Sequence, residues 1–209
     1  MKPSAARSIS LRNSIHPIRS RRPAAGVNQR DPGGFRNAVM VREADGLKPG
    51  DGRNAGPLIG ALIGMVAFFL VVGPRALDPG NIAWISRGDA AQHYLGWLFY
   101  RQSNWTFPLG LNPAYGLELS SAIVFSDSIP LLAIPFKVFS GFLPEVFQYF
   151  GIWLLVCFLL QGYFSFRLLQ LVSNSTVIVL LGVVLFVFSP PMLFRIITGH
   201  HSLVAHFIL

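Results

Sequence analysis

Charge is scarce in this chain after residue 56, and this scarcity constrains the fold more than any other feature. Residues 57–209 contain only six Lys or Arg and five Asp or Glu. A soluble domain would normally have about a quarter of its residues charged. So few charges, in a chain that is 52% hydrophobic, are typical of proteins whose helices lie in a lipid bilayer. We therefore predict an all-α fold, a polytopic helical membrane protein with the lipid bilayer as its main partner.

The first 56 residues have the opposite character. They carry eleven of the seventeen Lys and Arg residues but only four of the nine Asp and Glu residues. Their apolar residues follow neither the helix period nor the strand period, so this segment cannot bury enough surface to offset the entropy cost of ordering. We predict a disordered basic tail over residues 1–56. Its arginines are not spaced along a helix face, and we expect no specific nucleic acid partner.

A first span is predicted directly after this tail. The seventeen residues from Pro57 to Gly73 contain no charge. A helix of that length measures about 26 Å, close to the roughly 30 Å of a hydrocarbon core. Because eleven positive charges precede the segment, the positive-inside rule places the N-terminus in the cytoplasm and the residues after Gly73 outside.

The later topology depends on Ile129–Leu143, an apolar stretch that holds two prolines and Lys137. It is short for a crossing, and we expect a helix lying in the outer interface. The alternative is that it crosses, which would move Arg195 and the histidines near it to the cytoplasmic side. Because the chain stops at Leu209 within an apolar stretch, we expect a piece of a longer protein. The expected order is an outer loop at 74–146, spans at 147–171 and 176–190, an outer Arg/His segment at 191–202, and the start of another span at 203–209.

The outer loop contains a helix candidate over residues 89–102, DAAQHYLGWLFYRQ. Asp89, His93 and Trp97 recur every four residues and share one face of that helix. One interpretation is an N-cap aspartate followed by a polar stripe on an interfacial helix. The other is that the carboxylate and the imidazole converge on a cleft at the membrane surface, as base, proton partner or metal ligands. The tryptophans and tyrosines of this loop are typical of a membrane–water boundary.

Two further groups of residues are candidates for a site. Asp127 begins the pattern Asp-Ser-x-Pro, which indicates an N-cap, but it could equally be a second carboxylate at membrane depth. Arg195, His200 and His201 could hold a phosphate by charge-assisted hydrogen bonds. The alternative is that Arg195 extends to the interface and the histidines are solvated residues at a helix start. Adjacent His200 and His201 cannot both point inward from one helix face, so we do not expect them to form a zinc site together.

Several blocks of sequence resemble an uncharacterised family of bacterial multi-pass inner-membrane proteins. Over residues 84–209 these blocks are RGDAAQHYLGW, WTFPLGLNPAYG, SSAIVFSDSIPLLAIPFK, QYFGIWLLVCFLLQGYF and RIITGHHSL. That family is similar in architecture to membrane glycosyltransferases of the GT-C class. The resemblance implies a multi-pass protein of the bacterial inner membrane with a cytoplasmic N-terminus. Enzymes of this class have more spans than are predicted here, so we expect the chain alone to be inactive.

The resemblance also implies a reaction, the transfer of a sugar from a polyprenyl-phosphate donor on the periplasmic side. By its position after the first span, Asp89 matches the acidic residue near the acceptor in this class, where it would act as a general base. His93, Asp127 and Glu118 would be supports, orienting the acceptor or holding a divalent cation. Arg195 with His200 or His201 would stabilise the departing phosphate. No cofactor is assigned, and a divalent cation is left open.

A non-catalytic membrane protein is the competing class, such as a transport or envelope-assembly subunit. A transport pathway predicts charged residues buried within the spans. Here the charged residues are expected at the outer surface, which favours chemistry at that surface.

Overall fold

The computed structural model describes residues 55–116 and 120–208. The predicted disordered tail lies outside these residues, apart from Ala55 and Gly56, which begin the first described helix. Glu118 and Leu209 also lie outside them.

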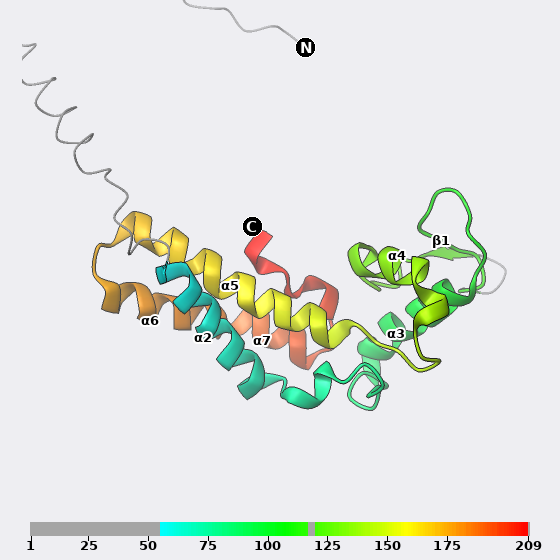
Figure 1. The fold of residues 1–209 in the computed structure, drawn as a ribbon, viewed down its shortest axis with the longest axis horizontal. Helices are drawn as coiled ribbons and strands as arrows, with labels where there is room; N and C mark the ends of the chain where they lie inside the picture. Colours follow the sequence, from blue (N-terminus) through cyan, green and yellow to red (C-terminus); the bar gives the residue numbers. More distant parts are fainter. Residues whose placement is uncertain (1–54, 117–119, 209) are drawn as a thin grey trace, which may run out of the picture. The chain divides into compact units, whose positions relative to one another are not determined.

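The described residues are mostly helical, as predicted (Figure 1). The only strands among them form one antiparallel pair, in which Leu111 lies opposite Ala122 and Asn112 opposite Ser121. The α-helices are α2 (Ala55–Val71), α3 (Gly88–Gln102), α4 (Pro130–Val138), α5 (Phe150–Val172), α6 (Thr176–Val187) and α7 (Pro190–Ile197). The short elements are 3-10 helices η2 (Pro74–Leu77), η4 (Ser140–Phe142), η5 (His201–Val204) and η6 (His206–Ile208), with strands β1 (Leu111–Asn112) and β2 (Ser121–Ala122).

Helix α2 packs along α5, and α6 returns beside α5 (Figure 1). Glycines make the α2–α5 contact unusually close. A Cβ atom added at Gly162 would lie 2.1 Å from the carbonyl oxygen of Gly60, and one added at Gly60 would lie 2.4 Å from the carbonyl oxygen of Gly162. Small residues spaced along a helix allow two backbones to approach in this way, which is a common means of packing helices in lipid. The surfaces of α2 and α5 are therefore complementary in shape at Gly60 and Gly162.

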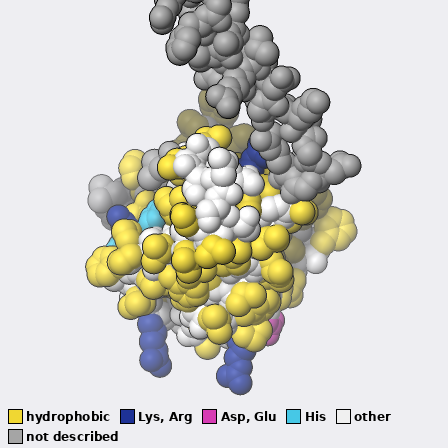
Figure 2. Space-filling model, turned by 90° about the vertical axis from the view of Figure 1, so that its left-hand side faces the viewer, with side chains coloured by type: hydrophobic (Ala, Val, Ile, Leu, Met, Phe, Trp, Pro, Cys, Tyr) yellow, Lys and Arg dark blue, Asp and Glu magenta, His cyan; other side chains and the backbone are white. Residues whose placement is uncertain are grey.

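Two described helical stretches are long and apolar enough to cross a membrane by length and composition, α5 and the stretch Thr176–Ile197 that contains α6 and α7. Helix α2, which corresponds to the predicted span 57–73, is apolar but shorter. Many large apolar side chains on these helices are exposed, and Figure 2 shows a face on which hydrophobic side chains predominate. On α2 and α6 they include Leu58, Leu62, Val66, Leu70, Val177, Ile178, Leu181 and Leu185.

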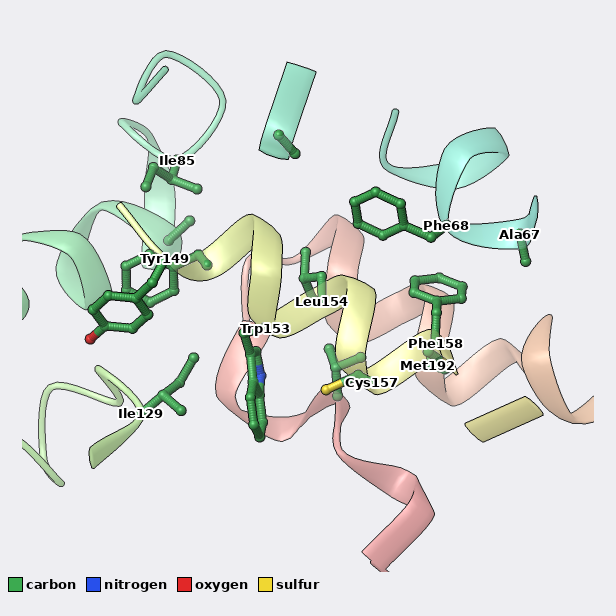
Figure 3. Packing of buried hydrophobic residues seen from close by; sticks show 14 of the residues in the cluster. Ala67, Phe68, Ile85, Ile129, Tyr149, Trp153, Leu154, Cys157, Phe158 and Met192 are labelled. Carbon is green, nitrogen blue, oxygen red and sulfur yellow. The ribbon is translucent and has the colours of Figure 1, made fainter. Parts of the chain in front are cut away.

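Within this group of helices the core is filled by apolar side chains of α5 (Figure 3). Leu154, Cys157 and Phe158 are fully buried, and the Phe158 ring meets the Phe68 ring edge-on with 6.0 Å between centroids. Met192 of α7 is buried in the same cluster. The single cysteine therefore acts as a small core residue, as its apolar surroundings in the sequence indicate.

Residues 74–116 and 120–149, called the polar segment below, are held together differently. The guanidinium of Arg101 donates to four backbone carbonyls, those of Ser140, Leu143, Pro144 and Glu145, over 2.7–3.2 Å. Gln148 donates to the carbonyl oxygens of Ala76 and Asp78, both at 2.8 Å. The indole of Trp97 donates to Phe147 at 3.0 Å. Side chains thus satisfy backbone groups that a helix or sheet would otherwise pair.

Two of the aromatic residues that were expected at a membrane–water boundary are enclosed within the protein. Trp97 and Tyr100 are fully buried, because they form the core of the polar segment with Phe147 and Tyr149. Lys137 is buried beside them, with its Nζ atom 2.9 Å from Ser103 Oγ and 4.0 Å from the centre of the Tyr100 ring. Burial lowers the pKa of the Lys137 amine.

The apolar stretch Ile129–Leu143 is divided between α4 and η4. The nine residues of α4 span about 14 Å, well short of a hydrocarbon core of about 30 Å. The N-cap of α4 is Ile129, which has a positive φ of 52° and makes no side-chain capping bond. The interpretation of Asp127 as the N-cap is therefore wrong. Asp127 lies two residues earlier, with a φ of 51°.

The last described residues form short helical elements, α7, η5 and η6, where the sequence predicts an Arg/His segment and the start of a span. Much of the predicted Arg/His segment 191–202 is helical, since α7 covers Pro190–Ile197. Of the stretch 203–209, the described residues form parts of η5 and η6. Such 3-10 turns are short because their hydrogen-bond geometry is poorer than that of an α-helix.

Candidate functional site

The candidate site forms where the first turn of α3 meets the turn that follows α7. Gly199 makes this approach possible, because it has a φ of +85° and a Cβ atom there would lie 2.9 Å from the backbone nitrogen of Ala90. Any other residue would be strained at this φ and would push the two segments apart. The turn places His200 beside Asp89, with 3.4 Å between Nε2 and Oδ2. Two residues that are far apart in the sequence thus become neighbours.

The Asp89–His200 pair is accessible to solvent. The Asp89 side chain is 58% exposed and that of His200 is 36% exposed. A carboxylate beside an imidazole can accept a proton from a bound hydroxyl and pass it on, which requires access to a substrate. The exposure of this pair meets that requirement, and it also means that the pair adds little to stability.

His93 lies one helical turn after Asp89, but its side chain is only 2% exposed. Its Nδ1 atom is 3.0 Å from the carbonyl oxygen of Ser126. Since a carbonyl can only accept, Nδ1 carries the hydrogen, and in the neutral ring Nε2 is a bare acceptor. The loop that supplies this carbonyl is further fixed by the Ser128 hydroxyl, which donates to the backbone of His93 at 2.6 Å.

His201 is only 3% exposed, in contrast to its neighbour His200. Its ring centre lies 5.2 Å from the Trp84 ring and 6.3 Å from the His93 ring. Trp153 of α5 donates to the His201 carbonyl at 2.8 Å, which fixes the turn to the start of α5. Burial lowers the pKa of His201 from 6.5 to about 4, helped by His93 and His200 and partly opposed by the backbone of Ile196. His201 is therefore neutral at ordinary pH.

The structure brings together four of the residues that the sequence singled out, Asp89, His93, His200 and His201. Asp127 lies in the loop that binds His93, between Ser126 and Ser128, but within the described residues its carboxylate has no ion pair. Arg195 is on α7 and joins the site through its backbone, because its carbonyl accepts the His200 N–H at 2.9 Å. Glu118 lies outside the described residues.

The interpretation of the Asp89–His93–Trp97 face as a polar stripe of an interfacial helix is wrong. His93 and Trp97 are buried, so this face of α3 points into the polar segment. The N-cap of α3 is Arg87, and Asp89 belongs to the first turn. Over residues 55–116 and 120–208, no group of three or more His, Cys, Asp or Glu side chains could hold a metal ion.

Sequence reasoning missed several residues that build the site. Trp84 packs on His201, Ser126 binds His93, and Trp153 binds the turn after α7. Gly199 was the one available signal, because a glycine directly before two histidines indicates a tight turn that could aim them in different directions. The partners of the other three residues come from distant segments, and no local pattern marks them.

Comparisons with known proteins gave a match to one family model. No curated protein and no solved structure matches the chain. One family model matches residues 61–209, a range that contains every candidate site residue from Asp89 to His201. The model is described as "Domain of unknown function (DUF6311)", and because it covers more than half of the chain, the protein belongs to the DUF6311 family.

Proposed function

We propose that this protein is a multi-pass protein of the bacterial inner membrane that transfers a sugar from a polyprenyl-phosphate donor to an acceptor hydroxyl on the periplasmic side. The observation that carries the proposal is the pairing of Asp89 with His200 at 3.4 Å in an accessible position. Such a pair has the composition of a general base with its proton partner.

The place of this pair in the fold supports the membrane part of the proposal. The site contacts the start of α5, through Trp153, and follows the end of α2. Helix α5 is long and apolar enough to span a bilayer. A site at the end of such a helix would lie at the membrane surface, where a lipid-linked donor presents its phosphate and sugar.

In the proposed reaction Asp89 removes the proton from the acceptor hydroxyl. The oxygen then attacks the anomeric carbon of the sugar and forms the new glycosidic bond. The bond between that carbon and the phosphate oxygen breaks, its electron pair leaves with the polyprenyl phosphate, and His200 accepts the proton from Asp89. Attack opposite the leaving phosphate inverts the anomeric centre. Arg195, on the adjacent helix α7, is the candidate for neutralising the phosphate.

The distribution of charge separates this proposal from a transport function. A transport pathway would need charged groups buried inside the spans. In the described residues of α5 and of the stretch Thr176–Ile197 the charged side chains are Arg167, which is exposed, and Arg195, which lies two residues from the end of its stretch. The buried polar residues of α5 are Gln161 and Ser165, which are neutral.

The orientation can be tested by thiol labelling in intact cells. Cys157 is fully buried and can be retained, so that single cysteines at Ala114 in the polar segment and Ser175 in the α5–α6 turn are the accessible thiols. An impermeant reagent should label Ala114→Cys from outside and Ser175→Cys only after lysis. Labelling of both positions from the same side would contradict the proposed crossing by α5.

The reaction can be tested with membranes that contain the full-length protein and a panel of radiolabelled polyprenyl-phosphate hexoses. Asp89→Asn should reduce transfer of label to membrane acceptors by about a hundredfold or more, the scale of general-base catalysis. Glu145→Gln is the matched control, because the Glu145 residue is exposed and lies outside the site. Unchanged transfer by Asp89→Asn contradicts the role of this carboxylate. Absence of transfer from every donor would favour the transport or envelope-assembly class.

A further inference from the structure

We infer that His93, His201 and Trp84 together bind one neutral hydroxyl group and disfavour an anion at the same place. The inference rests on the proposed function only in naming the acceptor as a source of that hydroxyl. The alternative source is an enclosed water molecule, which offers the same chemistry.

The first support is a set of buried polar atoms without partners. Within the described residues, Trp84 Nε1, His93 Nε2 and His201 Nδ1 are buried and make no hydrogen bond. An unpaired buried polar atom costs free energy, and most such atoms in folded proteins are satisfied by protein or by an enclosed guest. Here the three rings that carry these atoms are neighbours, since the Trp84 ring centre lies 5.2 Å and the His93 ring centre 6.3 Å from that of His201. A shared guest would satisfy all three.

The second support is the hydrogen-bonding character of the three atoms. His93 Nε2 is an acceptor, because Nδ1 of the same ring donates to Ser126. Trp84 Nε1 can only donate, and His201 Nδ1 donates in one of its two neutral tautomers. A hydroxyl group has one hydrogen to give and two lone pairs to fill. It therefore matches one acceptor and two donors without any proton transfer.

The same character disfavours a phosphate. A fully ionised phosphate oxygen has no hydrogen to offer the lone pair of His93 Nε2, so the ring would have to gain a proton. His201 is held neutral by its surroundings and adds no positive charge. The accessible pair Asp89–His200 would stand nearer to solvent than this hydroxyl site, because His93 and His201 are both almost completely buried. We therefore assign His201 to the acceptor side of the reaction, where it binds a hydroxyl other than the one that Asp89 deprotonates, and leave the phosphate to Arg195.

The test uses the full chain in lipid nanodiscs, isotopically labelled on the histidine ring nitrogens and assigned with single His→Gln variants. Magnetic resonance should find His93 in the neutral form with hydrogen on Nδ1. Its Nε2 resonance should be displaced from the free-acceptor position and should show a cross peak to a hydroxyl or water proton. Methyl α-glucoside is the neutral probe, and dimethyl phosphate, an anionic phosphodiester without a P–OH group, is the phosphate probe.

Two results support the inference and distinguish its sources. A cross peak that methyl α-glucoside leaves unchanged identifies an enclosed water, whereas one that shifts on its addition identifies a ligand hydroxyl. Two results overturn it, namely a His93 Nε2 resonance at the free-acceptor position without a cross peak, and a shift of both rings on addition of dimethyl phosphate. Because no sugar transfer is measured, failure of the proposed reaction would leave these readouts intact.

A variant pair keeps the test independent of folding. Trp84→Phe preserves the ring that packs on His201 but removes the donor, so the cross peak should weaken or be lost. Trp105→Phe removes an indole N–H from a half-exposed residue outside this cluster and should leave the cross peak unchanged. Equal effects of the two substitutions would contradict a guest held by Trp84.

Discussion

The apolar helices α2, α5 and α6 and the polar segment are stabilised in opposite ways. In the helices, backbone groups are satisfied internally, and neighbouring helices are matched by shape at glycines such as Gly60 and Gly162. In the polar segment, regular structure is short, and side chains such as Arg101 and Gln148 bind carbonyls that would otherwise be unpaired. A small substitution should therefore reduce stability most in the apolar helices when it adds volume. In the polar segment it should do so most when it removes a hydrogen-bond donor.

The largest loss of stability is expected when one methyl group is added at the α2–α5 contact. Gly162→Ala should cost about 3 kcal/mol of stability, the upper part of the usual range for overpacking, because the Cβ atom would lie 2.1 Å from the Gly60 oxygen. Gly141→Ala in η4 is the control, since its Cβ atom would meet nothing within 4 Å. Thermal unfolding in detergent measures both. Equal stability of the two variants would show that α2 and α5 are not packed as described.

Acid should have almost as large an effect through His201, which lies outside both regions but packs on Trp84 and His93 of the polar segment. The pKa of His201 falls from 6.5 to about 4 in the folded protein, so the unfolded chain binds a proton first as the pH drops. Stability is therefore complete above pH 6.5 and declines as the pH falls towards 4, by about 3 kcal/mol at about 1.4 kcal/mol per pH unit. Unfolding measured across this window should show a flatter decline in His201→Gln. An identical decline in that variant would assign the acid sensitivity to other groups.

Removal of a donor should cost less than either of these changes. Arg101→Met should destabilise the protein by about 2 kcal/mol, since it leaves four carbonyls without their charged donor in a partly exposed setting. Arg101→Lys should recover little of this loss, because an ammonium cannot reproduce the planar fork of the guanidinium. Arg87→Met, at an exposed position, is the control. A loss no larger than that of the control would mean that water replaces Arg101 at these carbonyls.

The smallest effect on stability is expected at the candidate site itself. A double-mutant cycle of Asp89→Asn and His200→Gln should give a coupling free energy below about 1 kcal/mol, because both side chains are exposed. Asp89→Asn should nevertheless reduce the proposed transfer by about a hundredfold or more. A coupling of 2 kcal/mol or more would instead identify the pair as part of what holds α3 and the turn after α7 together.

The helices were predictable where the chain is uniformly apolar. The predicted span 147–171 corresponds to α5, and the predicted helix 89–102 corresponds to α3, with ends that differ by at most a few residues. In a long apolar run, a helix pairs the backbone N–H and C=O groups within the segment itself. The interpretation of Asp127 as an N-cap was wrong, because the backbone has positive φ values at Asp127 and Ile129.

The site was predictable in its residues but not in their roles. Asp89, His93, His200 and His201 were identified by type and by expected side of the membrane, and they lie together. The division between the accessible pair Asp89–His200 and the buried His93 and His201 depends on the close approach of Gly199 to Ala90. That contact joins segments distant in the sequence, and helix periodicity carries no information about it.

The close contact of α2 with α5 also has a consequence for synthesis of the protein. Gly60 and Gly162 are separated by 102 positions in the chain. At about 5–20 residues per second, roughly 5–20 s pass between the translation of these two glycines. During that interval the glycine face of α2 is without its native partner, while the whole polar segment is made. We therefore expect lipid or another protein to cover the glycine face of α2 until α5 has been made.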